Sequence, residues 1–167
     1  AEQVLTEPFR ERWMVCEPQQ TVDEDCAWDN LEALAYRAWR RPVESEEVAS
    51  LVDVASLAAE TLGDFHDGMT YGVAAVLQSP SFLFRVENGE PSGSAGQRYT
   101  DYEMASRLSF FLWNGPPDDP LLEAAHAGEG VRFAAIVKSR PDVGWERQGG
   151  HGGDRMLRLG ATLGELA

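Results

Sequence analysis

Apolar residues recur at helical spacing through most of this chain, and no segment alternates apolar and polar residues convincingly at period two. The clearest stripe follows the i, i+3, i+4, i+7 pattern of one helix face and consists of Leu31, Leu34, Ala35 and Ala38. Similar stripes mark four segments, at about residues 23–40, 45–62, 65–78 and 100–113. The sequence therefore predicts an all-α fold, a small bundle of four to six helices with an irregular C-terminal tail.

Local signals place the ends of these helices. Thr100 and Glu103 form a capping box at the start of the fourth helix, in which each side chain satisfies the free backbone N–H of the other residue. Pro42, Gly63 and Pro80 stop the first, second and third helices. These signals delimit the helices independently of the apolar stripes.

Further residues refine the helical prediction. Ser45 is the expected N-cap of the second helix, and Asp119 is the expected N-cap of a short helix whose first residue is Pro120. Gly68 and Gly72 in the third helix allow close approach of a neighbouring backbone, at a cost of roughly 1 kcal/mol each relative to Ala.

The chain is strongly acidic for its length of 167 residues. It carries 28 Asp and Glu residues against 14 Lys and Arg residues, a net charge of −14. Such a surface repels phosphate backbones and anionic lipid headgroups, so nucleic-acid binding is not expected. No apolar run approaches the roughly 18 residues of a membrane helix, so no membrane span is expected.

Composition also divides the chain into segments. Residues 128–167 hold 9 of the 16 glycines and 6 of the 14 basic residues, but only 5 of the 28 acidic ones. Ordering a Gly-rich segment costs backbone entropy and gains little apolar burial. Residues 88–98, rich in Gly, Pro and Ser, are typical of a linker. We expect a helical domain at 10–87, a linker at 88–98, the start of a second, incomplete helical domain at 99–127 and a Gly-rich, poorly ordered tail at 128–167.

Cys16 and Cys26 are the only cysteines, and they lie ten positions apart. In a reducing cytosol they would be free thiols, whereas in a secreted chain they could close a loop and add roughly 2–3 kcal/mol of stability. The residues by themselves leave both states open. The chain has no C-x-x-C-H haem attachment motif and no paired Cys/His zinc spacing, so the sequence predicts neither a cofactor nor a metal site.

Paired carboxylates are the main candidates for catalysis. A glycosidase needs two carboxyl groups roughly 5–10 Å apart across a sugar-binding cleft. Asp101, Asp118 and Asp119 supply the residue types, and Arg107 could orient a substrate. Helix capping explains Asp119 and Glu103 without catalysis, and we favour that interpretation.

Two more polar groups have both a structural and a functional interpretation. His66 follows Asp64 at the start of the third helix, where a capping Asp beside a solvated His is favoured over an acid–base or metal cluster. Arg40, Arg41 and Arg85 stand among aromatic residues and many carboxylates. Arg–carboxylate pairs that join helices are favoured there over a clamp for a ligand carboxylate.

An ordered string of motifs resembles a known group of proteins. The sequences LAYRAWRRPV at 34–43 and SPSFLFRVE at 79–87 resemble a domain of unknown function found in large planctomycete and myxobacterial proteins. The sequence YTDYEMASRLSFFLW at 99–113 resembles the start of the domain that follows it in those proteins. The resemblance covers about residues 10–129.

The resemblance implies an exported protein, periplasmic or extracellular, whose relatives often carry a c-type haem domain upstream and further helical domains downstream. The positions of Cys16 and Cys26 fit the family pattern, which favours a disulfide bond between them. No catalytic residue carries over from the family, and no haem is implied in this chain. After about residue 129 the family pattern is lost, which suggests a truncated, frame-shifted or divergent end.

The leading functional interpretation is a non-catalytic helical scaffold beside a redox domain of a larger exported protein. Its partners would be the other domains of that protein, including a c-type haem domain. The first alternative is part of an extracellular enzyme acting on polysaccharide through Asp101, Asp118 and Asp119. The second alternative is a protein-interaction domain that uses its acidic face.

Overall fold

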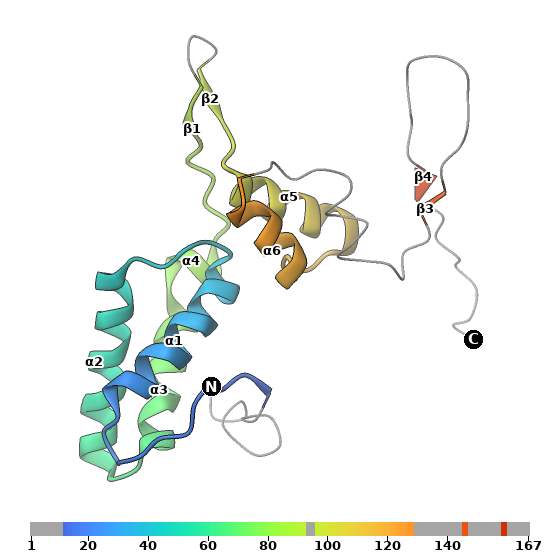
Figure 1. The fold of residues 1–167 in the computed structure, drawn as a ribbon. Coiled ribbons are helices and arrows are strands. Elements are labelled where there is room, and N and C mark those ends of the chain that lie inside the picture. The colour runs from blue at the N-terminus through green and yellow to red at the C-terminus, as the bar shows by residue number, and fades with distance from the viewer. Residues whose placement is uncertain (1–11, 93–95, 129–144, 147–157, 160–167) are drawn as a thin grey trace, which may run out of the picture.

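The computed structural model describes residues 12–92, 96–128, 145–146 and 158–159 (Figure 1). Its helices are α1 (Glu24–Trp39), α2 (Ser45–Leu62), α3 (Phe65–Gln78), α4 (Pro80–Leu83), α5 (Asp101–Trp113) and α6 (Asp119–His126). The first three helices pack as a bundle, and α5 packs on α6 beyond the end of α1. The predicted all-α class is confirmed. None of these helices is long and apolar enough to cross a bilayer.

Two short antiparallel strand pairs accompany the helices. In the segment expected as a linker, β1 (Glu90–Pro91) pairs with β2 (Gln97–Arg98). In the segment expected as a tail, β3 (Trp145–Glu146) pairs with β4 (Arg158–Leu159). Strands of two residues are too short to show a period-two pattern, so the sequence did not predict them. Residues 129–144, 147–157 and 160–167 of that tail lie outside the described residues.

The core of the bundle is built from the apolar stripes of α1, α2 and α3. Its fully buried large side chains are Leu31, Val48, Met69, Val73 and Val76. Trp39 at the end of α1 is also buried, and its indole N–H donates to the carbonyl oxygen of Val76 at 3.1 Å. A second, smaller cluster joins α5 to α6 through Ala105, Leu121 and Ala125.

The glycines of α3 sit where α2 and α1 come closest. A Cβ atom built on Gly68 would lie 2.6 Å from the carbonyl oxygen of Ala55 and 2.6 Å from the Cβ of Ala59. A Cβ on Gly72 would lie 3.0 Å from a methyl group of Leu31 and 3.2 Å from the Cβ of Ala55. The predicted close approach of a neighbouring backbone is confirmed at Gly68, whereas the atoms nearest to Gly72 belong to side chains.

Two predicted helix starts are wrong by one residue. The N-cap of α2 is Glu44 rather than Ser45, and the N–H of Glu44 donates to the Glu47 carboxylate at 3.0 Å. The N-cap of α6 is Asp118 rather than Asp119, and its carboxylate accepts an N–H of the first turn at 3.2 Å. In both places the residue expected as the cap already belongs to the helix, because the acidic residue before it holds the extended conformation that an N-cap needs.

Candidate functional site

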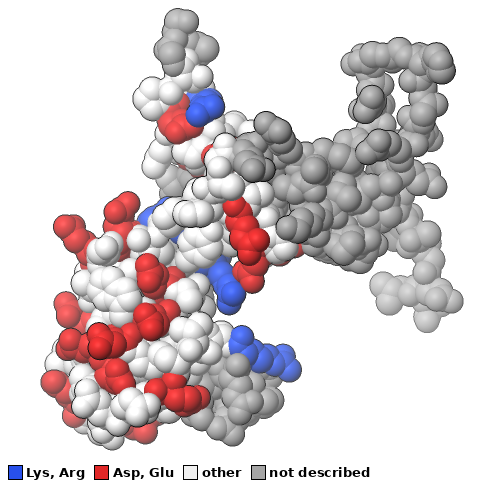
Figure 2. Space-filling model, viewed as in Figure 1, with Lys and Arg blue, Asp and Glu red and all other residues white. Residues whose placement is uncertain are grey.

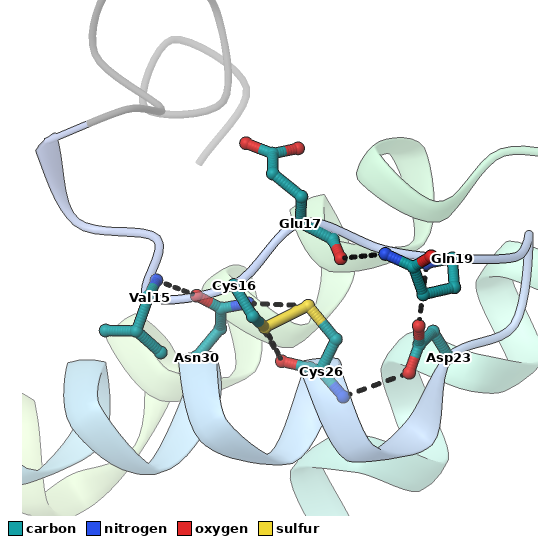
Figure 3. The surroundings of a disulfide bond; sticks show 7 residues. All are labelled: Val15, Cys16, Glu17, Gln19, Asp23, Cys26 and Asn30. Atoms are coloured by element: carbon teal, nitrogen blue, oxygen red, sulfur yellow. Dashed lines mark hydrogen bonds between the residues drawn. A yellow bond between two sulfur atoms is a disulfide. The ribbon is translucent and has the colours of Figure 1, made fainter.

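A disulfide bond joins Cys16 to Cys26 and ties the segment before α1 to the first turn of that helix (Figure 3). The Cα atoms of the two cysteines lie 5.8 Å apart, within the usual range for a disulfide. Cys26 is buried in the core of the bundle. The predicted disulfide is confirmed, and it anchors the N-terminal segment to the bundle.

Asn30 holds the same segment through hydrogen bonds, and its side chain is fully buried. Its amide nitrogen Nδ2 donates to the carbonyl oxygen of Cys26 at 2.8 Å and lies 3.0 Å from Sγ of Cys16 (Figure 3). Its Oδ1 accepts the backbone N–H of Val15 at 2.7 Å. The amphipathic pattern of α1 did not predict these contacts; their only signal in the sequence is an Asn on the apolar face of the helix.

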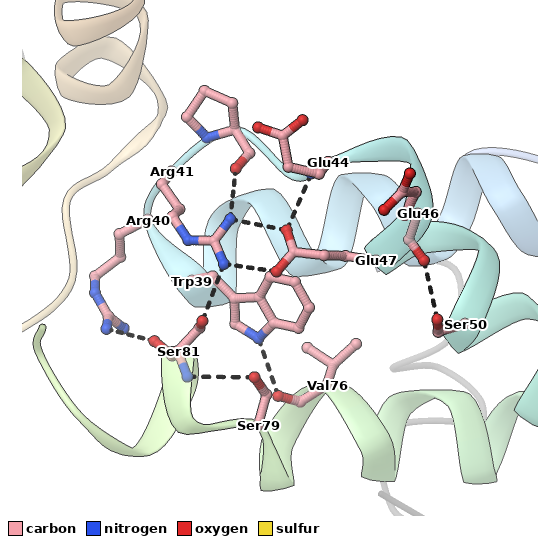
Figure 4. A network of polar contacts seen from close by, with 11 residues as sticks. Trp39, Arg40, Arg41, Glu44, Glu46, Glu47, Ser50, Val76, Ser79 and Ser81 are labelled. Carbon is pink, nitrogen blue, oxygen red and sulfur yellow. Dashed lines mark hydrogen bonds and ion pairs between the residues drawn. The ribbon is translucent and has the colours of Figure 1, made fainter.

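Arg40 follows α1 with its backbone in the left-handed region, at φ 61°. Its guanidinium is buried and donates to three carbonyl oxygens, those of Ala38 at 2.7 Å, Ser81 at 3.0 Å and Phe84 at 3.3 Å. Figure 4 shows its contact with Ser81. Arg40 thereby joins the end of α1 to α4 and to the residue after it.

The charge of Arg40 has no carboxylate partner among the residues that the structure describes. Burial and the neighbouring positive charge of Arg85 lower the pKa of Arg40 from its ordinary value. Carbonyl oxygens satisfy N–H groups but carry only partial charges. Within the described part of the chain, the positive charge of Arg40 is therefore balanced at close range only by carbonyl dipoles.

Arg41 forms the helix-joining ion pair that sequence analysis favoured for this region. Its guanidinium binds the Glu47 carboxylate through two hydrogen bonds of 3.0 and 2.9 Å and donates to Oγ of Ser81 at 3.0 Å (Figure 4). Its Cζ also lies 5.3 Å from the ring centroid of Trp39. Hydrogen bonding to Arg41 lowers the pKa of Glu47, against the opposing effect of burial.

Glu87, which precedes the β1–β2 pair, is shared by two arginines. Nε of Arg85 lies 3.5 Å from Oε1 of Glu87, and Arg107 of α5 binds Oε2 at 2.8 Å. The Cζ atom of Arg85 lies 5.5 Å from the ring centroid of Phe110. These contacts hold the segment after α4 against α5.

Glu103 fixes the start of α5 to the same segment. Its carboxylate accepts the backbone N–H groups of Asn88 at 2.6 Å, Gly89 at 2.9 Å and Thr100 at 2.8 Å. Burial opposes ionisation, but these N–H groups lower the pKa of Glu103 overall. The predicted capping box is confirmed, since the Thr100 hydroxyl accepts the N–H of Glu103 at 3.2 Å. The contacts of Glu103 with Asn88 and Gly89 were not predicted.

A groove of about 520 Å³ lies between the end of α1, α4 and the start of α5. Its volume falls within the range of small-molecule sites. The charged residues that line it are Arg40, Arg41, Arg85, Glu44, Glu87 and Glu103.

A second set of contacts joins α1 to α6. Arg37 binds the Asp119 carboxylate through hydrogen bonds of 3.0 and 3.1 Å. The Tyr36 hydroxyl lies 3.5 Å from the carbonyl oxygen of Leu122, at the limit of a hydrogen bond. The ring of Tyr36 also meets that of Tyr102 in α5 edge to face, with centroids 6.3 Å apart. These contacts connect the bundle to the α5–α6 pair.

Tyr36 and Tyr102 belong to a short polar chain. The Tyr102 hydroxyl lies 3.0 Å from Nδ1 of His126 in α6. Burial raises the pKa of Tyr36, and its interaction with Tyr102 and the negative charges of Asp119 and Glu123 raise it further. The Tyr36 phenol is therefore held in its neutral form.

The carboxylates proposed for catalysis have structural roles. Asp118 caps α6, Asp119 pairs with Arg37, and Asp101 lies in the first turn of α5, where a negative charge suits the helix dipole. Arg107 is held by Glu87. None of the four candidates, Asp101, Asp118, Asp119 and Arg107, lines the groove.

The contacts around His66 agree with the predicted helix cap at Asp64. The Asp64 carboxylate accepts the backbone N–H groups of His66 at 2.8 Å and Asp67 at 3.0 Å, which makes Asp64 the N-cap of α3. Within the described part of the chain, no group of three or more His, Cys, Asp and Glu residues is arranged to hold a metal ion.

Comparison with known proteins finds two families. Residues 26–87 match a family described as protein of unknown function (DUF1595), and residues 99–132 match one described as protein of unknown function (DUF1592). No curated protein and no solved structure shows significant similarity to the chain. The chain is therefore similar to DUF1595 from α1 through α4 and to DUF1592 across α5 and α6, and its function is unknown.

Proposed function

We propose that this chain is a helical scaffold module of an exported multidomain protein. Residues 10–87 form one domain, residues 99–127 start a second one, and residues 88–98 link them. The paired contact of Arg37 with Asp119 carries this proposal, because it holds α1 of the first domain to α6 of the second. A scaffold needs such contacts, since its task is to hold neighbouring parts in a constant orientation.

Residual dipolar couplings of the full chain test this scaffold role. We expect the amides of α1–α3 and of α5–α6 to fit one alignment tensor. The couplings of the double variant Arg37→Ala, Asp119→Ala should fit only with two separate tensors, one for α1–α3 and one for α5–α6. The chemical shifts within each of these two helical units should stay as in the unmodified chain. Arg98→Ala removes an exposed arginine that pairs with Glu90 in the hairpin and serves as the matched control. Two independent tensors in the unmodified chain would refute a fixed scaffold.

Export is supported by the disulfide bond between Cys16 and Cys26. Disulfides form and persist in oxidising compartments and are rare in the cytosol. The test is expression of the same chain with and without a secretory leader, followed by mass spectrometry after thiol alkylation. We expect no alkylated cysteine in the exported chain and two in the cytosolic chain. Free thiols in the exported chain would contradict the proposal.

The partner of the scaffold is a c-type haem domain of the same larger protein. The support is the family resemblance at 34–43, 79–87 and 99–113, whose members often carry such a domain upstream. Absorption spectroscopy of the purified full-length parent protein tests it. A Soret band is expected. If parent protein purified from a host that attaches haem showed no Soret band, the redox association would be refuted.

A second candidate function is recognition of a cationic partner by the acidic face of the bundle. Figure 2 shows acidic side chains spread over the three-helix part of the molecule. Exposed examples from α1 and α2 are Glu24, Asp25, Asp29, Glu32, Glu46, Asp53 and Glu60. Charge complementarity mainly raises association rates and weakens with salt, so binding to a basic partner should fall steeply with ionic strength.

A further inference from the structure

We propose that the groove between α1, α4 and α5 binds the carboxylate of a ligand that carries one negative charge and an apolar body, with Arg40 and Arg85 as the cations that receive it. This inference goes beyond the scaffold role, because it assigns a binding site to the module itself.

Arg40 supplies the first argument. It is buried, at 8% exposed, and lines the groove, yet its hydrogen bonds go only to the carbonyl oxygens of Ala38, Ser81 and Phe84. A buried charge is costly unless it is paired with an opposite charge. A guanidinium has five N–H donors, and these carbonyl contacts use three. Donors and charge therefore remain for an anion.

The carboxylates of the groove disfavour a ligand that carries more than one negative charge. Arg41 is neutralised by Glu47, and Glu103 is held by three backbone N–H groups. Arg85 reaches Glu87 only at 3.5 Å, while Arg107 binds the same carboxylate at 2.8 Å. Among the described residues, Arg40 and Arg85 are thus the arginines of the groove without a hydrogen-bonded carboxylate. Glu44, Glu87 and Glu103 line the same groove, and their carboxylates would repel a polyanion.

The walls of the groove indicate the rest of the ligand. Phe84 and Val86 line it and are 63% and 58% exposed, which leaves apolar surface for a ligand to cover. Ser106 also lines it, and its buried Oγ has no hydrogen-bond partner among the described residues.

Both N–H groups of Nη2 in Arg40 already donate to Ser81 and Phe84, so Arg40 offers single N–H groups to a ligand. Arg85 makes no hydrogen bond to a described residue and can bind a planar carboxylate through two parallel hydrogen bonds. A monocarboxylate with an apolar body would place its charge beside Arg40 and Arg85 and cover the exposed Phe84 and Val86 side chains.

Benzoate is the probe, and its neutral isostere benzamide is the ligand control. We expect benzoate, titrated into the ¹⁵N-labelled full chain, to shift the Gly89 amide and the Trp39 indole resonance with a Kd of about 1 mM. Benzamide should bind about tenfold more weakly, because it lacks the charge that the arginines recognise. Inorganic phosphate, which carries more negative charge, should bind more weakly than benzoate.

The protein variants separate a site from a general charge effect. Arg85→Gln should weaken benzoate binding about tenfold while the shifts of α2 stay unchanged. The matched control Arg98→Gln, which removes an exposed arginine of the hairpin, should leave binding unchanged. Arg40→Gln also removes contacts that join α1 to α4, so Arg85→Gln is the decisive variant.

Three results would overturn the proposal: no shift of the groove resonances by benzoate, equal binding of benzamide, or full retention of binding by Arg85→Gln. Tighter binding of phosphate than of benzoate would overturn the assignment of a monocarboxylate. The outcome is independent of the scaffold role, which the dipolar couplings test without any ligand.

Discussion

Gly68 of α3 lies so close to Ala55 of α2 that a Cβ atom on the glycine would stand 2.6 Å from the Ala55 carbonyl oxygen. The nearest atoms are backbone and a Cβ, which cannot move aside as the end of a long side chain can. We expect Gly68→Ala to lower the free energy of unfolding by about 1–3 kcal/mol, because overpacking outweighs the better helix propensity of Ala. Urea denaturation followed by circular dichroism measures it.

Substitutions at two other glycines serve as comparisons for Gly68→Ala. At Gly72 the crowding atoms include methyl groups of Leu31 at 3.0 and 3.1 Å, so Gly72→Ala should cost less than Gly68→Ala. At Gly115 the nearest atom to a new Cβ lies at 3.4 Å, an ordinary contact, so Gly115→Ala should be nearly neutral. A Gly68→Ala variant as stable as Gly115→Ala would show that α2 and α3 are not in such close contact.

Reduction of the disulfide should destabilise the bundle. Opening the bond between Cys16 and Cys26 frees a short loop in the unfolded chain, and we expect a loss of about 2–3 kcal/mol. The measurement is urea denaturation of the full chain with and without a reductant. The double variant Cys16→Ser, Cys26→Ser provides the control, since its stability should not respond to the reductant.

Replacing the buried Asn30 should lower the stability of the bundle. Asn30→Ala leaves the N–H of Val15 without its acceptor and the carbonyl oxygen of Cys26 without its side-chain donor. We expect a loss of about 1–3 kcal/mol in the free energy of unfolding. The exposed Gln19 is the comparison site, where Gln19→Ala should change stability little. Equal effects at the two positions would contradict the role assigned to Asn30.

Acid should weaken the ion pair at the start of α2. Pairing with Arg41 lowers the pKa of Glu47 below its ordinary value of 4.5 in the folded state. The stability from this group is therefore present above that ordinary value and is lost as the pH falls through the folded pKa. Glu47→Gln should cost about 1 kcal/mol at pH 7, because the pair is partly exposed.

The test of this ion pair is the difference in unfolding free energy between the unmodified chain and Glu47→Gln. That difference should be constant above about pH 5 and shrink as the pH falls further. Glu46→Gln, at the exposed neighbouring residue, should keep the acid response of the unmodified chain. A pH-independent difference would contradict the assigned pairing.

Alkaline pH should destabilise the fold in part through ionisation of Tyr36. Burial and its interaction with Tyr102 raise the pKa of Tyr36 above its ordinary value of 10.0 in the folded state. Its contribution to stability is therefore complete below that ordinary value and is lost as the pH rises toward the folded pKa. Tyr36→Phe should lose less stability than the unmodified chain when the pH rises from about 9 to 11.

Tyr71→Phe is the control for the alkaline response, because it changes an exposed tyrosine of α3 and retains Tyr36. Its stability should follow that of the unmodified chain across the same pH range. Urea denaturation at each pH provides the measurement. An unchanged alkaline response in Tyr36→Phe would show that the phenol is not held in its neutral form by the fold.

The sequence by itself determined the helices, because their signals are local. The stripe from Leu31 to Ala38 predicts the buried side of α1, and Thr100 with Glu103 marks the start of α5 within four residues. The close approach at Gly68 was also predictable, since a glycine inside a helix costs stability unless a neighbour needs the space. The disulfide depended on the family resemblance, because spacing left the state of the thiols open.

Only the tertiary structure decided which polar groups meet. Arg40, Arg85 and Glu103 come together in one groove although more than 60 positions separate the first from the last. Arg37 pairs with Asp119 across 82 positions, and no periodicity links such residues. The sequence around an arginine does not show whether its guanidinium donates to a carboxylate or to a carbonyl oxygen. The partner depends on how the helices pack, and packing of apolar stripes brings these polar ends together.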